Sequence, residues 1–584
     1  MGADANESKP AGVPGLRADF RELSAHASSY TLAAALLAAL VICYLAGLGL
    51  RPLVAADEFR YAEIAREMLT SGDWVLPRLD GALYFQKPVF GYWLTALSLH
   101  AFGHNAFAAR LPFALATLAA AASVFGLVRR FGPGGRWAVA AAAGFLSSAG
   151  VIAIGTAAVL DGLFALWVSA SLAAFFAASE QPAGRARQIW LALAGVACGA
   201  AFLTKGFLAV AIPVCVVIPY LVWSKRSTDM LRLAWTPLIA ALLTVAPWSL
   251  AIEFADGDFW RHFFVDEHWR RFTGGIHAQH PEPFWYFLPV VLVGALPWTP
   301  LIPVMCRAPI RTPLARFAIC WLVAPLLLLS ASSGKLATYA LPCVAPLFVW
   351  MACAAAALPT ERLAQALRRV AYGVAALAAV CGLGLLSPLA TGLGLDAVIG
   401  GGQPGPRFHL AAGLLLAAAL ATLGARSSRV EAPALGIGVS LPLIYAIVTL
   451  GFPAVPLHKA PGHWLAREVG PVPAQAIVVA DRILVHAVCW QLRRSDVSLL
   501  GSPGELTYGF ARADQRGRVL DEAGLAALLH DPARTRPVAV FVRTDRIGLP
   551  TDPAPLRRSE RGTVAFALYG APATQVEVTE RVGS

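Results

Sequence analysis

Two adjacent carboxylates, Asp57 and Glu58, open the stretch DEFRYAEIAREMLTSGDW directly after the first long apolar run of the chain. Asp161, in VLDGLF, is a third carboxylate between two apolar runs. Carboxylates in such positions can act as a general base or orient a reacting group. All three are candidates for such a role. Structural roles stay open, because Asp57 can also cap a helix and Asp161 can be a turn residue.

Several cations lie beside apolar or aromatic residues in separate short loops. They are Lys87 in YFQKPVFGYW, Lys205 in FLTKGFL, Lys335 in SSGKLATY, and Arg270 and Arg271 in EHWRRF. A lysine at a membrane boundary can simply reach toward water. Lysine also binds phosphate as a point charge, and arginine binds two oxygens at once. Together they predict a phosphate site that faces the carboxylates across one cavity, with the lipid tail left in the bilayer.

A second long loop contains four histidines, His262, His268, His277 and His280. A metal site formed by histidine and carboxylate is an alternative here, although the spacing matches no standard zinc pattern. Nothing in the sequence requires a cofactor, and a divalent metal ion stays an open possibility.

The elements that must position these residues are mostly membrane helices. The chain has 584 residues, of which 57% are hydrophobic and only 14% are charged, and this composition is typical of a polytopic membrane protein. Apolar runs of about 20 residues recur, each long enough to cross a bilayer. The segment 91–103 is too short to span and is expected to be re-entrant or interfacial. We predict about thirteen crossings, at 30–50, 107–128, 137–156, 162–178, 189–204, 206–223, 233–252, 284–305, 317–332, 336–358, 370–388, 409–425 and 433–451.

The distribution of basic residues predicts the orientation. Most of the net charge of +12 falls in the tail 1–29 and in alternate loops, which places both in the cytoplasm. The basic charge is therefore a topology signal and does not predict nucleic-acid binding. The transmembrane domain covers 30–451 and includes outer loops 51–90 and 253–283. Residues 452–584 form a soluble domain on the outer side.

Local patterns refine two of these parts. Apolar residues within 55–74 repeat at helical spacing, which predicts an amphipathic helix lying on the membrane surface. In 452–584, the β-type runs AIVVADRI and PVAVFVRT flank the helical stretch DEAGLAALLHD, so we expect a small α/β domain. We find no catalytic motif in that domain. The nine cysteines fit no metal or disulfide spacing and are expected to be small core residues.

The stretch DEFRYAEIAREMLTSGDWVLPRLDGALYFQKPVFGYWL resembles the first loop of the bacterial lipid A 4-amino-4-deoxy-L-arabinose transferases, membrane glycosyltransferases of the GT-C superfamily. FGHNAFAARLPFALA, FLTKGF, EHWRRFTGG, PEPFWYFLPV and SSGKLATYALP support the resemblance. It implies a donor of undecaprenyl phosphate carrying one sugar, lipid A as acceptor, and the periplasmic face of the bacterial inner membrane as the location. We expect a monomer surrounded by membrane lipids. Alternatives are a transferase for another sugar, glycolipid or protein, and a lipid-linked sugar flippase.

The resemblance also implies roles for single residues. Asp57 is the key catalytic carboxylate, with Glu58 beside it and Asp161 as a second acidic member. Family members carry Glu-Lys-Pro where this chain has Gln86-Lys87-Pro88, and that Glu can join a His in binding a metal. Gln86 and His268 are therefore the candidate metal ligands, although Gln86 weakens the metal hypothesis. The substrate-binding candidates are Arg60, Tyr61, Tyr84, Lys87, Lys205, Arg270, Arg271, Lys335 and Tyr339.

Overall fold

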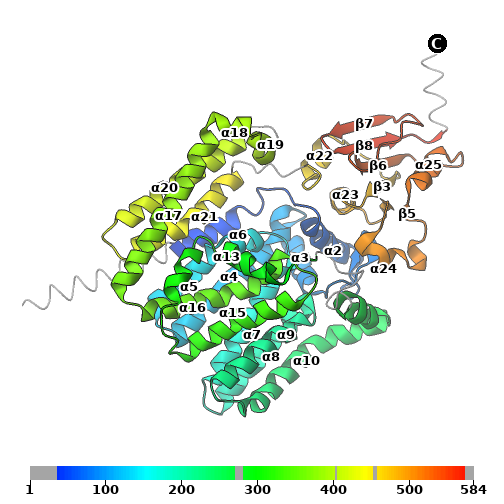
Figure 1. Ribbon diagram of the computed structural model, residues 1–584. Coiled ribbons are helices and arrows are strands. Elements are labelled where there is room, and N and C mark those ends of the chain that lie inside the picture. Colours follow the sequence, from blue (N-terminus) through cyan, green and yellow to red (C-terminus); the bar gives the residue numbers. More distant parts are fainter. Residues whose placement is uncertain (1–35, 270–280, 401–403, 451–456, 573–584) are drawn as a thin grey trace, which may run out of the picture.

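The computed structural model describes residues 36–269, 281–400, 404–450 and 457–572. A bundle of helices makes up most of the molecule, and a small domain with a β-sheet lies against one end of it (Figure 1). The mostly helical fold with a C-terminal α/β domain, as predicted, is confirmed.

Nine helices in the described residues are long and apolar enough to cross a membrane. Two bent helix pairs raise this number to eleven if each is one span, and the apolar helices Leu36–Ala46 and α9 are shorter. The predicted count of thirteen crossings is thus not confirmed. The bounds of the spanning helices are α4 Ala106–Phe131, α7 Leu160–Ser179, α8 Arg185–Lys205, α10 Asp229–Ala255, α15 Pro313–Ala331, η4 with α16 Ala337–Ala357, α17 Thr360–Leu386, α20 Gly405–Arg426 and α21 Ala432–Leu450, with α9 at Leu208–Trp223.

Two runs predicted as single spans are broken. Helices α5 (Gly135–Leu146) and α6 (Ala149–Gly155) meet at 64°, and the pair Phe284–Gly294 and Thr299–Met305 meets at 102°. The two breaks hydrogen-bond to each other: the amide of Ala149 donates to the carbonyl of Leu296 over 2.9 Å, and Trp298 Nε1 donates to Ser147 Oγ over 3.0 Å. Backbone groups freed by each break are therefore satisfied inside the protein, as an apolar environment demands.

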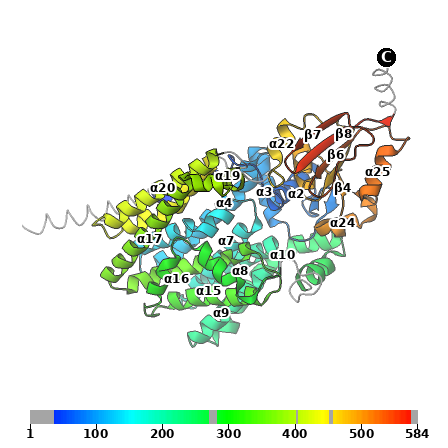
Figure 2. The same cartoon turned by 45° about the horizontal axis from the view of Figure 1, so that its top comes forward.

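Helices α17, α20 and α21 lie side by side at one edge of the bundle in both views (Figures 1 and 2). Short helices α18 (Pro388–Gly392) and α19 (Leu395–Gly400) connect α17 to α20. Helices α7, α8, α15 and α16 form the centre of the bundle, away from this edge.

Outer loop 51–90 folds into helix α2 (Asp57–Ser71) and a small hairpin of β1 (Arg78–Leu79) and β2 (Ala82–Leu83). Helix α2 ends at Gly72, whose φ of 71° is the left-handed conformation that closes many helices. Helix α3 (Phe90–Phe102) follows. Loop 253–283 begins with α11 (Phe259–Arg261) and the π-helix η1 (His262–Trp269).

The C-terminal domain is built on a six-stranded sheet in the order β5-β4-β3-β6-β8-β7, in which β3 to β6 run parallel and the β7–β8 hairpin is antiparallel. The strands are β3 Ile477–Asp481, β4 Ser498–Leu500, β5 Val519–Leu520, β6 Val538–Arg543, β7 Arg557–Arg561 and β8 Val564–Tyr569. Its helices are α22 Gly462–Arg467, α23 Val485–Leu492, α24 Thr507–Phe510 and α25 Glu522–His530. The predicted strands in AIVVADRI and PVAVFVRT and the predicted helix in DEAGLAALLHD are confirmed.

The C-terminal domain covers the polar face of helix α2, the helix that we predicted to lie on the membrane surface. Glu63, Arg66 and Glu67 are all buried there, and Arg66 donates to Ser495 Oγ over 2.8 Å. Arg518 Nη2 donates to the carbonyls of Asp80, Ser495 and Val497 over 2.7–2.9 Å and so joins the β1–β2 turn to the domain.

Arg512 reaches across to Asp256, at the end of α10, over 2.5 Å. The first outer loop, the second outer loop and the C-terminal domain therefore share one side of the molecule.

Candidate functional site

A buried ion pair fixes the start of α2 to the bundle. Both carboxylate oxygens of Glu58 accept from Arg110 of α4, over 2.7 and 2.6 Å, and the amides of Val54 and Ala158 donate to them over 2.9 Å. Burial favours the neutral acid, but Arg110 more than offsets this and lowers the pKa of Glu58. The remaining Arg110 donors bind backbone carbonyls at Leu48, Arg51 and Pro52. All Glu58 oxygens are thus engaged in fixing α2 to the bundle, and the catalytic role of Glu58 stays a prediction.

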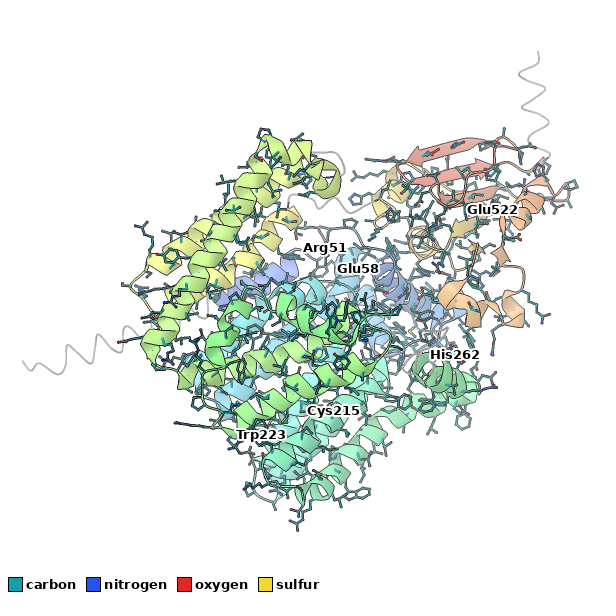
Figure 3. All side chains as sticks on the ribbon, in the orientation of Figure 1. Arg51, Glu58, Cys215, Trp223, His262 and Glu522 are labelled. Atoms are coloured by element: carbon teal, nitrogen blue, oxygen red, sulfur yellow. The ribbon has the colours of Figure 1, made fainter. Side chains whose placement is uncertain are left out.

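Asp57, its neighbour, is turned outward. Its side chain is 53% exposed, and its carboxylate accepts from Arg60 Nη1 over 2.5 Å. Ala56 occupies the N-cap position, and no side chain caps α2. The predicted capping role of Asp57 is therefore wrong, because its carboxylate turns toward the next helical turn. Figure 3 labels Arg51 and Glu58, which mark this junction between the bundle and the C-terminal domain.

The C-terminal domain contributes a residue that sequence analysis missed. Glu505 accepts from the second terminal nitrogen of Arg60 over 2.6 Å, and the hydroxyl of Tyr84 lies 3.4 Å from its other oxygen. His486 lies 3.5 Å from Glu505 on one side and 2.7 Å from Asp80 on the other.

The charges around Glu505 and His486 reinforce each other. Burial alone would raise the pKa of Glu505, but Arg60 and His486 lower it to about 2. Burial would lower the pKa of His486, but Asp80 and Glu505 raise it to about 9. A continuous charged chain thus runs from Asp80 through His486, Glu505 and Arg60 to Asp57. No short sequence motif marks Glu505, which lies in the unremarkable stretch PGELTYGF.

A second ion pair lies where α7 begins and α8 ends. Lys205 Nζ is 2.7 Å from Asp161 Oδ1, and both residues are only 9% exposed. The same ammonium lies 4.3 Å from the ring centroid of Tyr339 and 5.8 Å from that of Phe164, within cation–π range. The structure thus brings three predicted site residues, Asp161, Lys205 and Tyr339, together.

Tyr61, also predicted, lies beside Tyr92 and Arg60. Its ring centroid lies 6.0 Å from that of Tyr92 and 5.9 Å from the guanidinium of Arg60. Burial raises the pKa of Tyr61 well above its usual range, and the carboxylates of Asp57 and Asp161 raise it further.

The other residues predicted to bind phosphate do not share one set of contacts. Lys87 Nζ donates to the carbonyl of Gln86 over 3.0 Å. Lys335 Nζ donates to the carbonyls of Glu282, over 2.9 Å, and Ser332. Arg270 and Arg271 lie outside the described residues.

The predicted metal pair, Gln86 and His268, can be examined only at Gln86. The hydroxyl of Tyr84 donates to Gln86 Oε1 over 3.0 Å, so this neutral amide already has a hydrogen-bond partner. An amide is also a weaker metal ligand than a carboxylate. His268 belongs to η1, and its side chain lies outside the described part of the chain. Gln86 thus fits a metal poorly, and none of the chemistry below depends on one there.

Three other cations form ion pairs inside the protein. Arg110 binds Glu58, Arg66 binds Glu63 over 2.8 and 2.5 Å, and Arg407 lies 2.9 Å from Asp396. At the candidate site itself, Arg60 is paired with Asp57 and Lys205 with Asp161.

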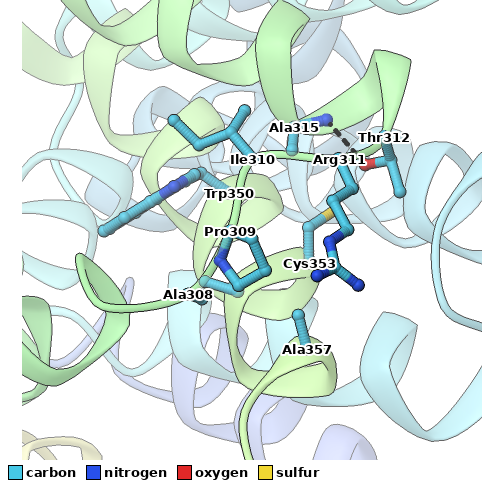
Figure 4. Close-up of a pocket in the computed structure, with 10 residues that line it drawn as sticks. Ala308, Pro309, Ile310, Arg311, Thr312, Ala315, Trp350, Cys353 and Ala357 are labelled. Carbon is cyan, nitrogen blue, oxygen red and sulfur yellow. Dashed lines mark hydrogen bonds between the residues drawn. The ribbon is translucent and has the colours of Figure 1, made fainter.

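Two cavities are lined by described residues. The first, of about 40 Å³, is lined by Arg311, Thr312, Trp350 and Cys353 among others, and holds at most a few water molecules (Figure 4). The second, of about 220 Å³, lies beside Arg51, between Phe59 and Trp490.

The chain thus offers an exposed carboxylate held by a clamped arginine and a buried lysine–aspartate pair. These groups suit transfer chemistry on a lipid head group. The lysine can stabilise charge that develops on a leaving phosphate. The exposed aspartate can orient a group arriving from the water side.

Comparisons with known proteins agree with this chemistry. The family model of dolichyl-phosphate-mannose-protein mannosyltransferases matches residues 29–263, and the model of the C-terminal domain of arabinosyl transferase ArnT matches residues 457–567. A protein of Shewanella sediminis is 35% identical over 541 residues, which cover 91% of this chain and 96% of the relative. A protein of Pectobacterium atrosepticum is 36% identical over 551 residues, covering 91% and 97%. Both are named undecaprenyl phosphate-alpha-4-amino-4-deoxy-L-arabinose arabinosyl transferase.

The fold also matches a solved structure. The crystal structure of ArnT from Cupriavidus metallidurans bound to undecaprenyl phosphate has a TM-score of 0.78 to this chain at 25% identity, covering 92% of this chain and 98% of that one.

Proposed function

Because the chain belongs to the family of undecaprenyl phosphate-alpha-4-amino-4-deoxy-L-arabinose arabinosyl transferases, we propose that it transfers 4-amino-4-deoxy-L-arabinose from undecaprenyl phosphate to a phosphate of lipid A. The observation that carries the proposal is the exposed carboxylate of Asp57 held by the Arg60–Glu505 pair. The added amino sugar lowers the negative charge of the outer membrane and gives resistance to cationic peptides such as polymyxin.

The reaction places a negative charge on the departing polyprenyl phosphate. Lys205 and Lys87 are the cations proposed to stabilise it, with Arg270 or Arg271 and Lys335 as further ligands. Lys87 Nζ donates to the carbonyl of Gln86, the residue whose side chain accepts from Tyr84. Tyr339, which lies over the ammonium of Lys205, is proposed to keep that charge at the site.

Asp57 is proposed to act on the acceptor side. A phosphate monoester has a second pKa of about 6, so it is largely a dianion and already nucleophilic at neutral pH. Asp57 then takes the last proton or binds the donor sugar, and Arg60 fixes its orientation. Asp161, held by Lys205, is proposed as the second carboxylate beside the sugar. The sugar is transferred with inversion at its anomeric carbon, as GT-C enzymes generally do.

The topology supports a periplasmic site. Loop 51–90 follows the first predicted span and the C-terminal domain follows the last, and their contacts place them on the same side. We propose that this side is the periplasm, that the N-terminus is cytoplasmic, and that the enzyme acts as a monomer in the inner membrane. No cofactor and no nucleic acid enters the proposed reaction.

A second candidate is transfer of a different sugar from the same carrier. It is favoured by Gln86, a neutral amide where the family carries Glu, bonded here to Tyr84 beside Glu505. A competition assay with two undecaprenyl-phosphate sugars, one with and one without the 4-amino group, separates the candidates. Preferential transfer of the amino sugar supports the first, and preferential transfer of the other sugar supports the second.

The direct test uses purified protein in detergent with undecaprenyl-phosphate-aminoarabinose and lipid A, followed by mass spectrometry of lipid A. We expect a mass gain of one aminoarabinose. Lipid A of unchanged mass would contradict the proposal. If the sugar were found on another glycolipid or on a protein, that molecule would be the acceptor in place of lipid A.

A further inference from the structure

Three elements from separate parts of the chain bring a buried set of acidic groups together. Helix α2 contributes Glu63 and Glu67, the β1–β2 turn contributes Asp80, and α23 of the C-terminal domain contributes Cys489. Glu63, Asp80 and Cys489 are each 0% exposed, and Glu67 is 4% exposed. The cluster thus lies inside the joint between the membrane domain and the C-terminal domain, away from the outward-facing carboxylate of Asp57.

The donor atoms of this cluster are close enough to share one ion. One carboxylate oxygen of Glu63, one of Asp80 and the sulfur of Cys489 all lie within 4.8 Å of one another. Ligands bound at 2.0–2.3 Å in a tetrahedral zinc site are separated by about 3.3–3.8 Å, so a small adjustment brings these atoms into position.

A second observation points independently to a ligand. Asp80 Oδ2 accepts from His486 over 2.7 Å, whereas the described residues provide no hydrogen bond to the fully buried Oδ1. A buried carboxylate oxygen without a partner costs free energy, and native structures rarely leave one in that state. A metal ion would satisfy this oxygen.

The excess negative charge in the joint also favours a bound metal cation. With a thiolate at Cys489, the cluster holds four negative groups. Among the described residues, the cations bonded to them are Arg66, on Glu63, and His486, on Asp80. One divalent cation would bring the joint to neutrality.

We propose that Glu63, Asp80 and Cys489 bind a structural zinc ion that joins helix α2 to the C-terminal domain. Mixed sulfur and oxygen donors select zinc over magnesium or calcium, which prefer oxygen alone. Arg66 and His486 orient the ligating carboxylates from the second layer, as outer partners do in many metal sites. Glu67 is the adjacent carboxylate that can complete four-fold coordination. The site is separate from Gln86 and His268 and does not depend on the transfer activity.

The first test measures the metal content of the full-length protein, purified without chelators, by inductively coupled plasma mass spectrometry. We expect about one zinc ion per chain in the wild type. Cys489→Ala and Asp80→Asn should remove at least half of it, whereas Cys306→Ser, at an exposed cysteine, should keep it. A wild type without zinc, or zinc that persists in both cluster variants, would overturn the proposal.

The second test needs no variant and therefore does not depend on variant folding. Zinc is removed from wild-type protein with a chelator, and Co²⁺ is added. Coordination by a cysteine thiolate gives Co²⁺ an intense charge-transfer absorption in the near ultraviolet, with visible bands typical of four-fold geometry. We expect both, together with a higher thermal midpoint when metal is restored. If neither band appears, Cys489 is a buried thiol and no metal ligand.

Discussion

Arg60, on the first turn of helix α2, lies 2.6 Å from Glu505, a residue 445 positions later in the C-terminal domain. The same guanidinium holds Asp57 through its other terminal nitrogen. The C-terminal domain, which shows no catalytic motif in sequence, is thereby connected to the carboxylate that we propose as catalytic. A charge in that domain sets the orientation of a side chain in the membrane domain.

Glu505→Gln should impair transfer without unfolding the protein. The substitution removes the charge-assisted bond to Arg60, worth about 1.5–3 kcal/mol, so we expect kcat/KM to fall roughly 10- to 100-fold. Steady-state transfer to lipid A measures this effect. Glu522→Gln, at an exposed glutamate of the same domain, is the control and should keep wild-type kcat/KM. Equal activity of both variants would remove Glu505 from the site.

Glu58→Gln should act on stability. It breaks a buried pair with Arg110 and leaves that guanidinium partly unpaired, which costs about 3–5 kcal/mol in the free energy of unfolding. Thermal denaturation in detergent measures the loss. Glu180→Gln, which breaks the partly exposed Arg226–Glu180 pair, should change the midpoint little. A fully stable Glu58→Gln protein without activity would support the predicted catalytic role of Glu58.

A double-mutant cycle can separate the effects of Lys205 and Asp161 on stability from their effects on transfer. Lys205→Gln alone leaves Asp161 buried without its cation, so we expect lower stability and at least about tenfold lower kcat/KM. Adding Asp161→Asn should recover stability, because the unpaired charge is gone, but should leave transfer low. Recovery of transfer as well would mean that Lys205 serves only to neutralise Asp161.

The pKa of His104 predicts how the free energy of unfolding depends on pH. It stacks on Trp490 of the C-terminal domain, with ring centroids 3.5 Å apart, and burial followed by the charge of Arg493 lowers its pKa to about 4. The unfolded chain therefore binds a proton between about pH 6.5 and 4 that the folded chain does not. The contribution of His104 to the free energy of unfolding is therefore complete above pH 6.5. It is lost as the pH falls from about 6.5 to about 4.

The measurement compares thermal midpoints at pH 7.5 and pH 4.5 for the wild type and for His104→Gln, which cannot titrate. We expect the wild type to lose more stability on acidification than the variant does. Identical losses would show that His104 does not titrate between the folded and unfolded states.

Much of the membrane architecture could be predicted because apolar run length is a local property. Helices such as α4 and α7 coincide closely with predicted spans. The breaks at Ser147 and Leu296 could not be predicted, since each is satisfied by the other across the bundle. Helix α2 was predicted to lie on the membrane surface from its local pattern of apolar residues. That pattern could not reveal that the polar face is covered, because the covering domain follows hundreds of residues later.

The candidate site was predictable to the extent that residue type carries the chemistry. Asp161, Lys205 and Tyr339 were each predicted separately and meet in the structure. The different environments of Asp57 and Glu58 could not be predicted, because Arg110 lies 52 residues away from Glu58. Glu505 was missed for the same reason: its partners Arg60 and Tyr84 are brought to it only by domain docking.

The catalytic role of Asp57 is the central claim, and Asp57→Asn in the purified transfer reaction tests it most directly. Asp229→Asn is the matched control, because Asp229 also begins a helix and pairs with an arginine three residues away. Mass spectrometry of lipid A should show transfer by the wild type and by Asp229→Asn, and at least about 100-fold slower transfer by Asp57→Asn. Transfer by Asp57→Asn at the wild-type rate would contradict the account.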